Sequence, residues 1–234
     1  MHPTDRDLPP TWEERLSPIA AAERSQDWLT VAALCRRWIR EQDWNPLPYH
    51  WLGVALRAQG LVHNASAPLN AAHVRMTNLH PAVWAGPDGF GGVLLSTLAQ
   101  HCIELGKLEG ALGHARFLSV KIDPGNLGWA YNRAWLCIQI AKKARERRSV
   151  ELREEALEQS ACIIQQGGHV PAALVMYGQI TAMLGLKDRA REAVEKLRAL
   201  DTQAAHQLTN EVNRLLDESI LEQGVPRRNF LGIF

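Results

Sequence analysis

Apolar residues recur along most of this chain at the three- and four-residue intervals of an amphipathic α-helix. One stripe precedes Gly185 and consists of Leu174, Tyr177, Gly178 and Thr181. A second stripe follows the same glycine and consists of Ala190, Val194, Leu197 and Leu200. No segment has the strict alternation of a half-buried β-strand, so the pattern predicts an all-α protein.

A short motif occurs three times with unchanged internal spacing. In each copy a bulky residue precedes a small one, a glycine follows seven positions after the small residue, and an alanine follows five positions after the glycine. The copies are Leu52-Gly53 with Gly60 and Ala65, Leu98-Ala99 with Gly106 and Ala111, and Tyr177-Gly178 with Gly185 and Ala190. Because glycine adopts the left-handed conformation that ends a helix, each copy predicts two helices joined by a tight turn.

The small residues of the motif predict close packing inside each helix pair. Gly53, Ala99 and Gly178 of the first helices are expected to face Ala65, Ala111 and Ala190 of the second helices. Without large side chains between them, the two helix axes can approach each other closely.

This motif resembles the tetratricopeptide repeat (TPR), which has a period of about 34 residues, Leu-Gly in its first helix and Ala in its second. The glycine spacings of 46 and 79 residues exceed one and two such periods, so we expect two insertions and a further, hidden repeat. The resemblance implies a right-handed α-solenoid of about five helix hairpins, closed by a C-terminal capping helix.

Turn signals predict the boundaries of these parts. A loop is expected at residues 77–92, and the second insertion is placed at Lys142–Leu152. Asp27-Trp28 is expected to form the first corner, which has no glycine. In the hidden repeat, Arg133 occupies a position that is usually apolar in the family. The predicted parts are a flexible N-terminus at 1–11, repeats at 12–45, 46–80, 92–124, 127–168 and 171–201, a capping helix at 202–223 and an apolar tail at 224–234.

The resemblance implies that the first helices line a concave groove that binds an extended or helical segment of another protein. Some relatives hold a carboxylate with a cationic clamp, but the matching positions here are His50, Val54, Thr97 and Asn132, so no such clamp is expected. Carried over by position, the groove residues are Leu47, His50, Val54, Arg57, Ser96, Gln100, Ile103, Glu104, Tyr131, Trp135, Ile138, Val175, Gln179 and Met183.

Tyr131, Trp135 and Ile138 lie on one face of their predicted helix, away from its other apolar face. Trp135 either contacts a ligand or packs against the neighbouring repeat, and the sequence leaves both open. The apolar character of the groove resembles that of bacterial secretion chaperones, by analogy of fold.

The apolar tail carries Phe230, Leu231, Ile233 and Phe234. Each large apolar side chain gains about 1.5–3 kcal/mol on burial, so the tail is expected to dock. It packs either on its own last repeats or on a partner or second copy, which would give a homo-oligomer.

Composition and motifs restrict the remaining function classes. The formal net charge is only +1. The N-terminal residues lack the basic-then-apolar order of a secretory signal, and no apolar run is long enough to span a bilayer. We therefore expect a cytoplasmic protein without membrane contact. The four cysteines are far apart and are interpreted as small buried residues, and the nine histidines form no metal-binding pair. The glycine-rich segment 86–92 lacks the Gly-Lys-Ser/Thr ending of a phosphate loop. We therefore expect no enzyme activity, cofactor or metal.

Three hypotheses follow for the function. The first is a protein-binding scaffold, adaptor or chaperone that holds a partner segment in the groove. The second is a structural or regulatory subunit that assembles through its convex face or its tail. The third is nucleic-acid binding, which we do not favour because no aromatic residues are interleaved with the basic cluster. That cluster consists of Lys142, Lys143, Arg145, Arg147 and Arg148.

Overall fold

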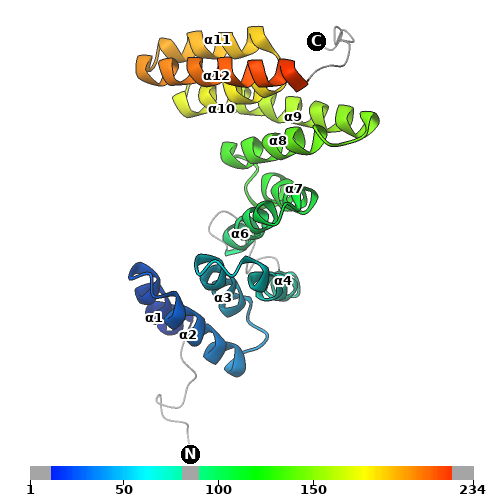
Figure 1. Ribbon diagram of the computed structural model, residues 1–234. Helices are drawn as coiled ribbons and strands as arrows, with labels where there is room; N and C mark the ends of the chain where they lie inside the picture. The colour runs from blue at the N-terminus through cyan, green and yellow to red at the C-terminus, as the bar shows by residue number, and fades with distance from the viewer. Residues whose placement is uncertain (1–11, 81–89, 223–234) are drawn as a thin grey trace, which may run out of the picture. The chain divides into compact units, whose positions relative to one another are not determined.

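The computed structural model describes residues 12–80 and 90–222, and these residues form eleven α-helices, one π-helical segment and no β-strand (Figure 1). The predicted all-α fold is therefore confirmed. The elements in order are α1 (Trp12–Arg24), α2 (Trp28–Glu41), α3 (Pro46–Ala58), α4 (Val62–Thr77), α6 (Phe90–Glu104), α7 (Leu108–Phe117), η2 (Leu118–Ile122), α8 (Leu127–Ala141), α9 (Glu146–Gly167), α10 (Pro171–Met183), α11 (Lys187–Arg198) and α12 (Thr202–Glu222).

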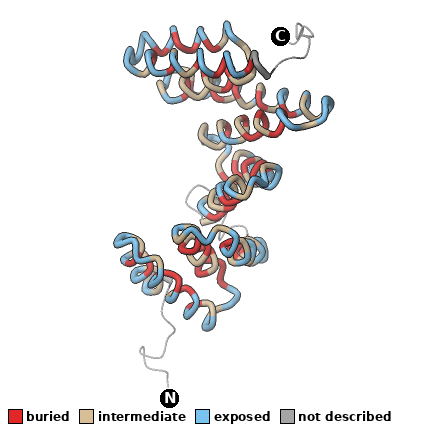
Figure 2. Tube along the Cα trace, in the orientation of Figure 1, coloured by how far each residue is buried: buried red, intermediate tan, exposed pale blue. Residues whose placement is uncertain are grey.

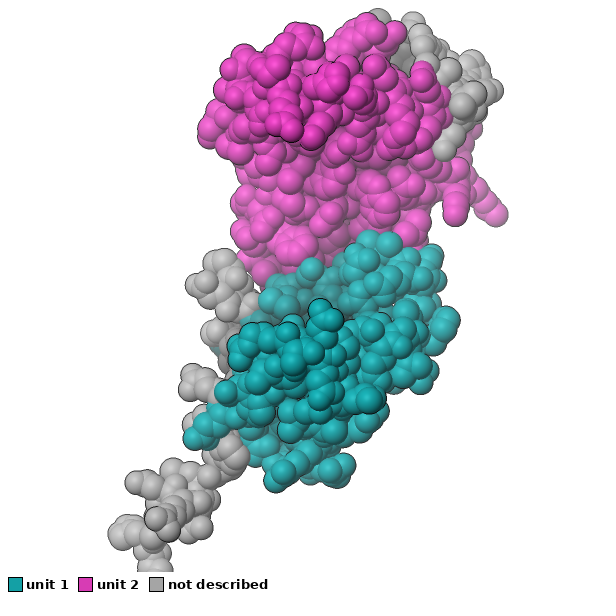
Figure 3. Space-filling view, turned by 60° about the vertical axis from the view of Figure 1, so that its left-hand side comes forward, with its two compact units in different colours: residues 1–107 teal, residues 108–234 magenta. Residues whose placement is uncertain are grey.

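The chain divides into two compact units, unit 1 from Met1 to Lys107 and unit 2 from Leu108 to Phe234 (Figure 3). In unit 1, α2 packs against α1 and α3, and α4 packs against α3 and α6. In unit 2, α8 packs against α7 and α9, while α10 contacts α8, α9, α11 and α12. Within each unit the buried residues follow the helix sides that face neighbouring helices (Figure 2), which is how stacked helix hairpins form a continuous core.

The three motif glycines form the turns that the sequence predicts. Gly60, Gly106 and Gly185 have φ angles of +76°, +69° and +74°, and each lies two residues before the next helix begins. The residue after each glycine donates its N–H to a carbonyl five residues earlier, for example Leu61 to Leu56 at 2.9 Å. This is the hydrogen bond of a Schellman motif, which satisfies the last carbonyl groups of the helix.

The first hairpin uses the same turn with a different residue. Gln26 has a φ of +58°, and the N–H of Asp27 donates to the carbonyl of Ala22 at 2.9 Å, again five residues earlier. The Asp27 carboxylate then accepts the N–H of Thr30 at 3.1 Å and caps α2. The expected corner at Asp27-Trp28 was therefore displaced, because Gln26 takes the left-handed position and Asp27 acts as the helix cap.

These turns predict opposite effects for two substitutions. A Cβ at Gly60 would meet no atom within 4 Å, so Gly60→Ala should destabilise unit 1 by about 1 kcal/mol through backbone strain alone. Gln26→Gly removes a comparable strain and should stabilise slightly, after the larger entropy of the unfolded glycine is subtracted. Urea denaturation followed by circular dichroism measures both changes. Changes of the same sign in the free energy of unfolding for the two variants would contradict this explanation of the turns.

Close packing at the small residues involves other partners than we expected. A Cβ at Gly53 would lie 2.5 Å from the side chain of Leu69, and a Cβ at Gly178 would lie 3.0 Å from Leu208 and 3.4 Å from Ala193. The predicted partners Ala65 and Ala190 are fully buried, but the atoms nearest to these two glycines belong to other residues. Each glycine leaves space at the surface of its helix. A leucine side chain of another helix occupies that space, so a methyl group on the glycine would collide with it.

The structure shows what occupies the two expected insertions. Residues 146–152 belong to α9, which has 22 residues, so part of this insertion lengthens a helix. At the other insertion, α4 continues to Thr77 and α6 begins at Phe90, while residues 81–89 lie outside the described part. Phe90 packs against the core of α1, α2 and α3, and this contact supports a helix start in a glycine-rich segment.

Candidate functional site

In unit 2, α8, α10 and α12 bring together most of the predicted groove residues of this half. Tyr131 and Trp135 of α8 are half-buried, as are Val175, Gln179 and Met183 of α10. Helix α10 contacts both α8 and α12, so these residues belong to three neighbouring helices of one compact unit. We call the surface formed by Tyr131, Trp135, Val175, Gln179, Met183 and Glu211 the α8–α10–α12 face.

Apolar packing holds three side chains of this face, those of Tyr131, Val175 and Met183. Tyr131 packs against a cluster that contains Ala130, Ile163 and Ala173. Val175 and Met183 pack against the core that α10 and α11 share with α12. Ile138 is only 4% exposed, so it belongs to the core and cannot contact a ligand as predicted. The third position of the predicted stripe therefore lies in the core, whereas the first two are half-buried.

One polar contact spans the face. The Gln179 side-chain amide donates from Nε2 to Oε2 of Glu211 at 3.0 Å and joins α10 to α12. Burial raises the pKa of the Tyr131 hydroxyl, and the negative charge of Glu211 raises it further. Glu211 was not among the predicted groove residues, because residues 202–223 were predicted only to form a capping helix. Its position three residues after Leu208, which is buried against α10, was the available signal.

In unit 1, the predicted groove residues of α3 and α6 bind each other. Arg57 donates from Nε to Glu104 Oε2 at 3.0 Å and from Nη2 to Oε1 at 2.5 Å. Gln100 donates to the same carboxylate at 3.5 Å. These charges were expected to line the groove, but they join two consecutive hairpins. Val54, Ser96 and Ile103 remain half-buried at the surface.

Leu47 and His50 are buried, with 8% and 5% of their surface exposed, so the prediction that the groove exposes them was wrong. His50 Nε2 lies 3.0 Å from the hydroxyl oxygen of Thr97. That hydroxyl already donates its proton to the carbonyl of Val93 at 2.9 Å, so Nε2–H is the donor to Thr97. Burial, with a smaller contribution from Arg57, lowers the pKa of His50 to about 4.

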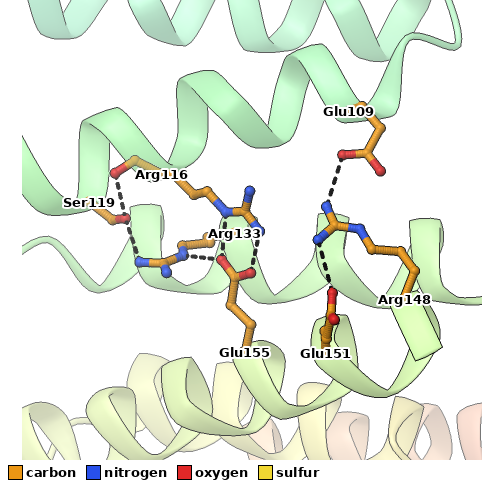
Figure 4. A network of polar contacts seen from close by, with 7 residues as sticks. All are labelled: Glu109, Arg116, Ser119, Arg133, Arg148, Glu151 and Glu155. Atoms are coloured by element: carbon orange, nitrogen blue, oxygen red, sulfur yellow. Dashed lines mark hydrogen bonds and ion pairs between the residues drawn. The ribbon is translucent and has the colours of Figure 1, made fainter.

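A network around Glu155 explains why an arginine stands at a usually apolar position. Glu155 of α9 accepts from Arg116 Nε of α7 at 2.8 Å and from Arg133 Nε of α8 at 2.7 Å (Figure 4). A second contact joins Arg116 Nη2 to the other carboxylate oxygen. Burial by itself would raise the pKa of Glu155, but hydrogen bonds from both arginines outweigh it and lower the pKa to about 2. The network ties three helices of unit 2 together.

The basic cluster at residues 142–148 is partly neutralised. Arg147 pairs with Glu151 at 3.3 Å, and Arg148 lies 3.3 Å from Glu109 and 3.7 Å from Glu151. These are solvent-exposed pairs that contribute little to stability. They reduce the positive charge that a nucleic acid would meet.

The cysteines and histidines form no reactive centre in the described residues. Cys35 and Cys137 are buried, and burial raises the pKa of each thiol to about 12. Cys102 and Cys162 are half-buried, so the predicted full burial holds for two of the four. Across residues 12–80 and 90–222, no group of three or more His, Cys, Asp or Glu side chains could hold a metal ion.

In the same ranges, no helix combines the length and apolar character that crossing a bilayer requires. The predicted docking residues Phe230, Leu231, Ile233 and Phe234 lie outside the described part.

Helix hairpins, closed by turns with a residue of positive φ and packed side by side within each unit, define an all-α helical-repeat fold. No family model matches the chain, and no curated protein matches it. Among solved structures, the chain is similar to YrrB, described as a TPR protein with an unusual peptide-binding site, with a TM-score of 0.58 and 13% identity over 82% of this chain and 88% of that one. A thermophilic TPR protein of Thermus thermophilus aligns with a TM-score of 0.47 and 19% identity over 76% and 91% of the two chains. The similarity to YrrB shows that this chain has the TPR fold.

Proposed function

We propose that this chain is a protein-binding scaffold, acting as an adaptor or chaperone, and that it holds a partner segment against the α8–α10–α12 face. The observation that carries the proposal is the grouping of Tyr131, Trp135, Val175 and Met183 as half-buried side chains on neighbouring helices of unit 2. Aromatic residues that are partly buried in their own protein supply large contact areas with little loss of side-chain entropy. YrrB, which shares the fold, has a peptide-binding site, and this supports a peptide as the ligand.

The polar groups of the face indicate how a partner segment would be oriented. Glu211 holds Gln179 with one carboxylate oxygen. Its other oxygen lies 3.8 Å from Nη2 of Arg214, beyond hydrogen-bond distance, and can accept a further hydrogen bond. The tyrosine hydroxyl and this carboxylate favour a partner that presents an N–H donor or a cation beside apolar side chains.

In unit 1, Val54, Ser96 and Ile103 would add a smaller contact area. All three are half-buried, and two of them are aliphatic.

Trp135→Ala tests the proposal. Truncation of a central aromatic residue at an interface removes about 2 kcal/mol or more, so recovery of bound partners should fall by about 30-fold or more. Isotope-labelled mass spectrometry of proteins captured by the wild-type and variant chains measures this ratio, and circular dichroism checks that helicity is unchanged.

Trp44→Ala is the matched control, since Trp44 is 53% exposed and belongs to unit 1. It loses the same side chain and should keep the full set of partners. If a folded Trp135→Ala protein captures the same partners in the same amounts, the α8–α10–α12 face is not the binding surface.

We do not adopt nucleic-acid binding through residues 142–148. Arg147 and Arg148 already hold carboxylates, and single-stranded nucleic acid needs aromatic platforms beside the charges. Assembly through the apolar tail concerns residues outside the described part and stays a prediction from the sequence.

A further inference from the structure

Unit 1 contains a hollow between α2, α3 and α4. Its volume is about 510 Å³, and apolar groups of Ile39, Leu52, Ala67, Pro68 and Ala71 make up most of its lining. This is the size of a pocket that accepts one or two large side chains. We call it the α2–α4 hollow. None of its lining residues is among the groove positions predicted from the sequence.

Two arginines belong to the lining of the hollow. Arg36 and Arg40 lie four residues apart on α2, line the hollow and are exposed. Among the described residues neither has a hydrogen-bond or ion-pair partner, and no carboxylate lines the hollow. Glu41, the neighbour of Arg40, is occupied by Arg15 at 2.6 Å and Arg37 at 3.2 Å. Glu41 therefore does not neutralise the positive charges of Arg36 and Arg40.

A third guanidinium is fixed at the edge. The Arg75 guanidinium lies 4.0 Å from the centroid of the Tyr49 ring, and Tyr49 lines the hollow. Arg75 also donates to the carbonyl of Ala71 at 3.3 Å and to that of Asp43. This group is held in place before any ligand arrives, which lowers the entropy lost on binding.

We propose that the α2–α4 hollow binds an acidic, amphipathic segment of a partner protein, with a bulky apolar side chain in the hollow and two carboxylates paired with Arg36 and Arg40. Residues four apart on a helix are about 6 Å apart along its axis. Carboxylates one turn apart on a partner helix, or two residues apart on an extended strand, match that separation. Arginine binds carboxylates in a bidentate manner, which adds orientation to the charge attraction.

The lining distinguishes this partner from a nucleic acid. Most of the lining is aliphatic, and one face of Tyr49, the aromatic ring of the hollow, is covered by Arg75. Single-stranded RNA would need free aromatic faces for its bases. The hollow belongs to unit 1, so this site is separate from the α8–α10–α12 face and requires a different partner chemistry.

Selection of short random peptides displayed on phage tests the proposal, using the full chain as bait. The wild-type chain should enrich peptides in which two acidic residues flank a bulky apolar one. Arg36→Glu with Arg40→Glu should lose this class, and fluorescence anisotropy with an enriched peptide should show at least about tenfold weaker binding. The same peptide with Gln in place of its acidic residues should bind the wild-type chain about tenfold more weakly, which needs no variant protein.

Three further variants make the result specific. Ala67→Trp fills the hollow from an exposed position and should abolish binding of the enriched peptide without a change of charge. Arg153→Glu with Arg191→Glu makes the same charge change on exposed helix faces of unit 2 and should leave binding unchanged. Trp135→Ala should also leave binding of the enriched peptide unchanged. A failure of the α2–α4 hollow proposal can therefore be distinguished from a failure of the proposed function of the α8–α10–α12 face.

Enrichment of the same peptides by the wild-type and Arg36→Glu/Arg40→Glu chains would overturn the proposal. So would equal binding of the acidic and Gln peptides, or binding of oligouridine RNA at Arg36 and Arg40 that the enriched peptide does not displace.

Discussion

Replacing Glu155 with alanine is expected to lower the free energy of unfolding of unit 2 by about 3 kcal/mol. The reason is that the substitution leaves two arginines without their carboxylate, in a region where the Arg133 and Glu155 side chains are only 17% and 14% exposed. Arg116 is 37% exposed and can partly recover hydration, so the largest loss should come from Arg133. Urea denaturation measures the total, and hydrogen exchange in α7, α8 and α9 locates it.

Glu151→Ala is the control for this change, because Glu151 lies one turn earlier on the same helix and pairs with Arg147 and with Arg148. Figure 4 shows the pair with Arg148. Its side chain is 49% exposed, so its loss should cost less than about 0.5 kcal/mol. The folded pKa of Glu155, about 2, is below its usual value of 4.5, so its contribution is present above about pH 4.5 and is lost as the pH falls toward 2. The difference between wild type and Glu155→Gln should shrink over that interval. Similar losses for Glu151→Ala and Glu155→Ala would show that burial adds nothing to the network.

The stability of unit 1 is expected to fall by about 2–3 kcal/mol between pH 7 and pH 4 because of His50 alone. Its pKa is lowered from 6.5 to about 4 in the folded protein, so the unfolded chain binds the proton first. The contribution is fully present above about pH 6.5 and decreases as the pH falls to about 4. A charged His50 would have to remain in the core near Arg57, which explains the direction of the change.

His50→Gln isolates this contribution, because glutamine can still donate to Thr97 but does not titrate in this range. Burial also lowers the pKa of His73 and His101 in the same unit, so the readout is the difference between the pH profiles of wild type and variant. His169→Gln, at an exposed position of unit 2, should reproduce the wild-type profile. Parallel profiles for wild type and His50→Gln would mean that His50 does not titrate differently on unfolding.

The two proposed surfaces divide recognition between the two units. The α8–α10–α12 face offers aromatic and aliphatic side chains with one carboxylate, whereas the α2–α4 hollow offers an aliphatic pocket with free guanidinium groups. A partner suited to one would be poorly suited to the other, because a carboxylate placed against Glu211 is repelled. On these two proposals, the charge pattern of each surface would set which kind of segment it accepts.

Features that depend on a few consecutive residues were readable from the sequence. The helix stripes and the turns at Gly60, Gly106 and Gly185 follow from side-chain periodicity and from the absence of a Cβ, which act within one or two helical turns. They are sufficient to predict an all-α chain of hairpins. The same local reasoning placed the first corner one residue late, because nothing in the sequence marks Gln26 as a residue that accepts a positive φ.

Only the tertiary structure decided which of the predicted groove residues lie at the surface and which lie in the core. Glu155 pairs with Arg133 and Arg116, which lie 22 and 39 residues away in the sequence, and Arg57 pairs with Glu104, which lies 47 residues away. Such pairings depend on how far each helix is rotated about its axis when it packs. A rotation of a few tens of degrees moves Ile138 or His50 from a groove into a core without any change in the periodicity of the sequence. The sequence by itself therefore determined the helices and their turns, while the rotation of packed helices decided the surfaces that could bind a partner.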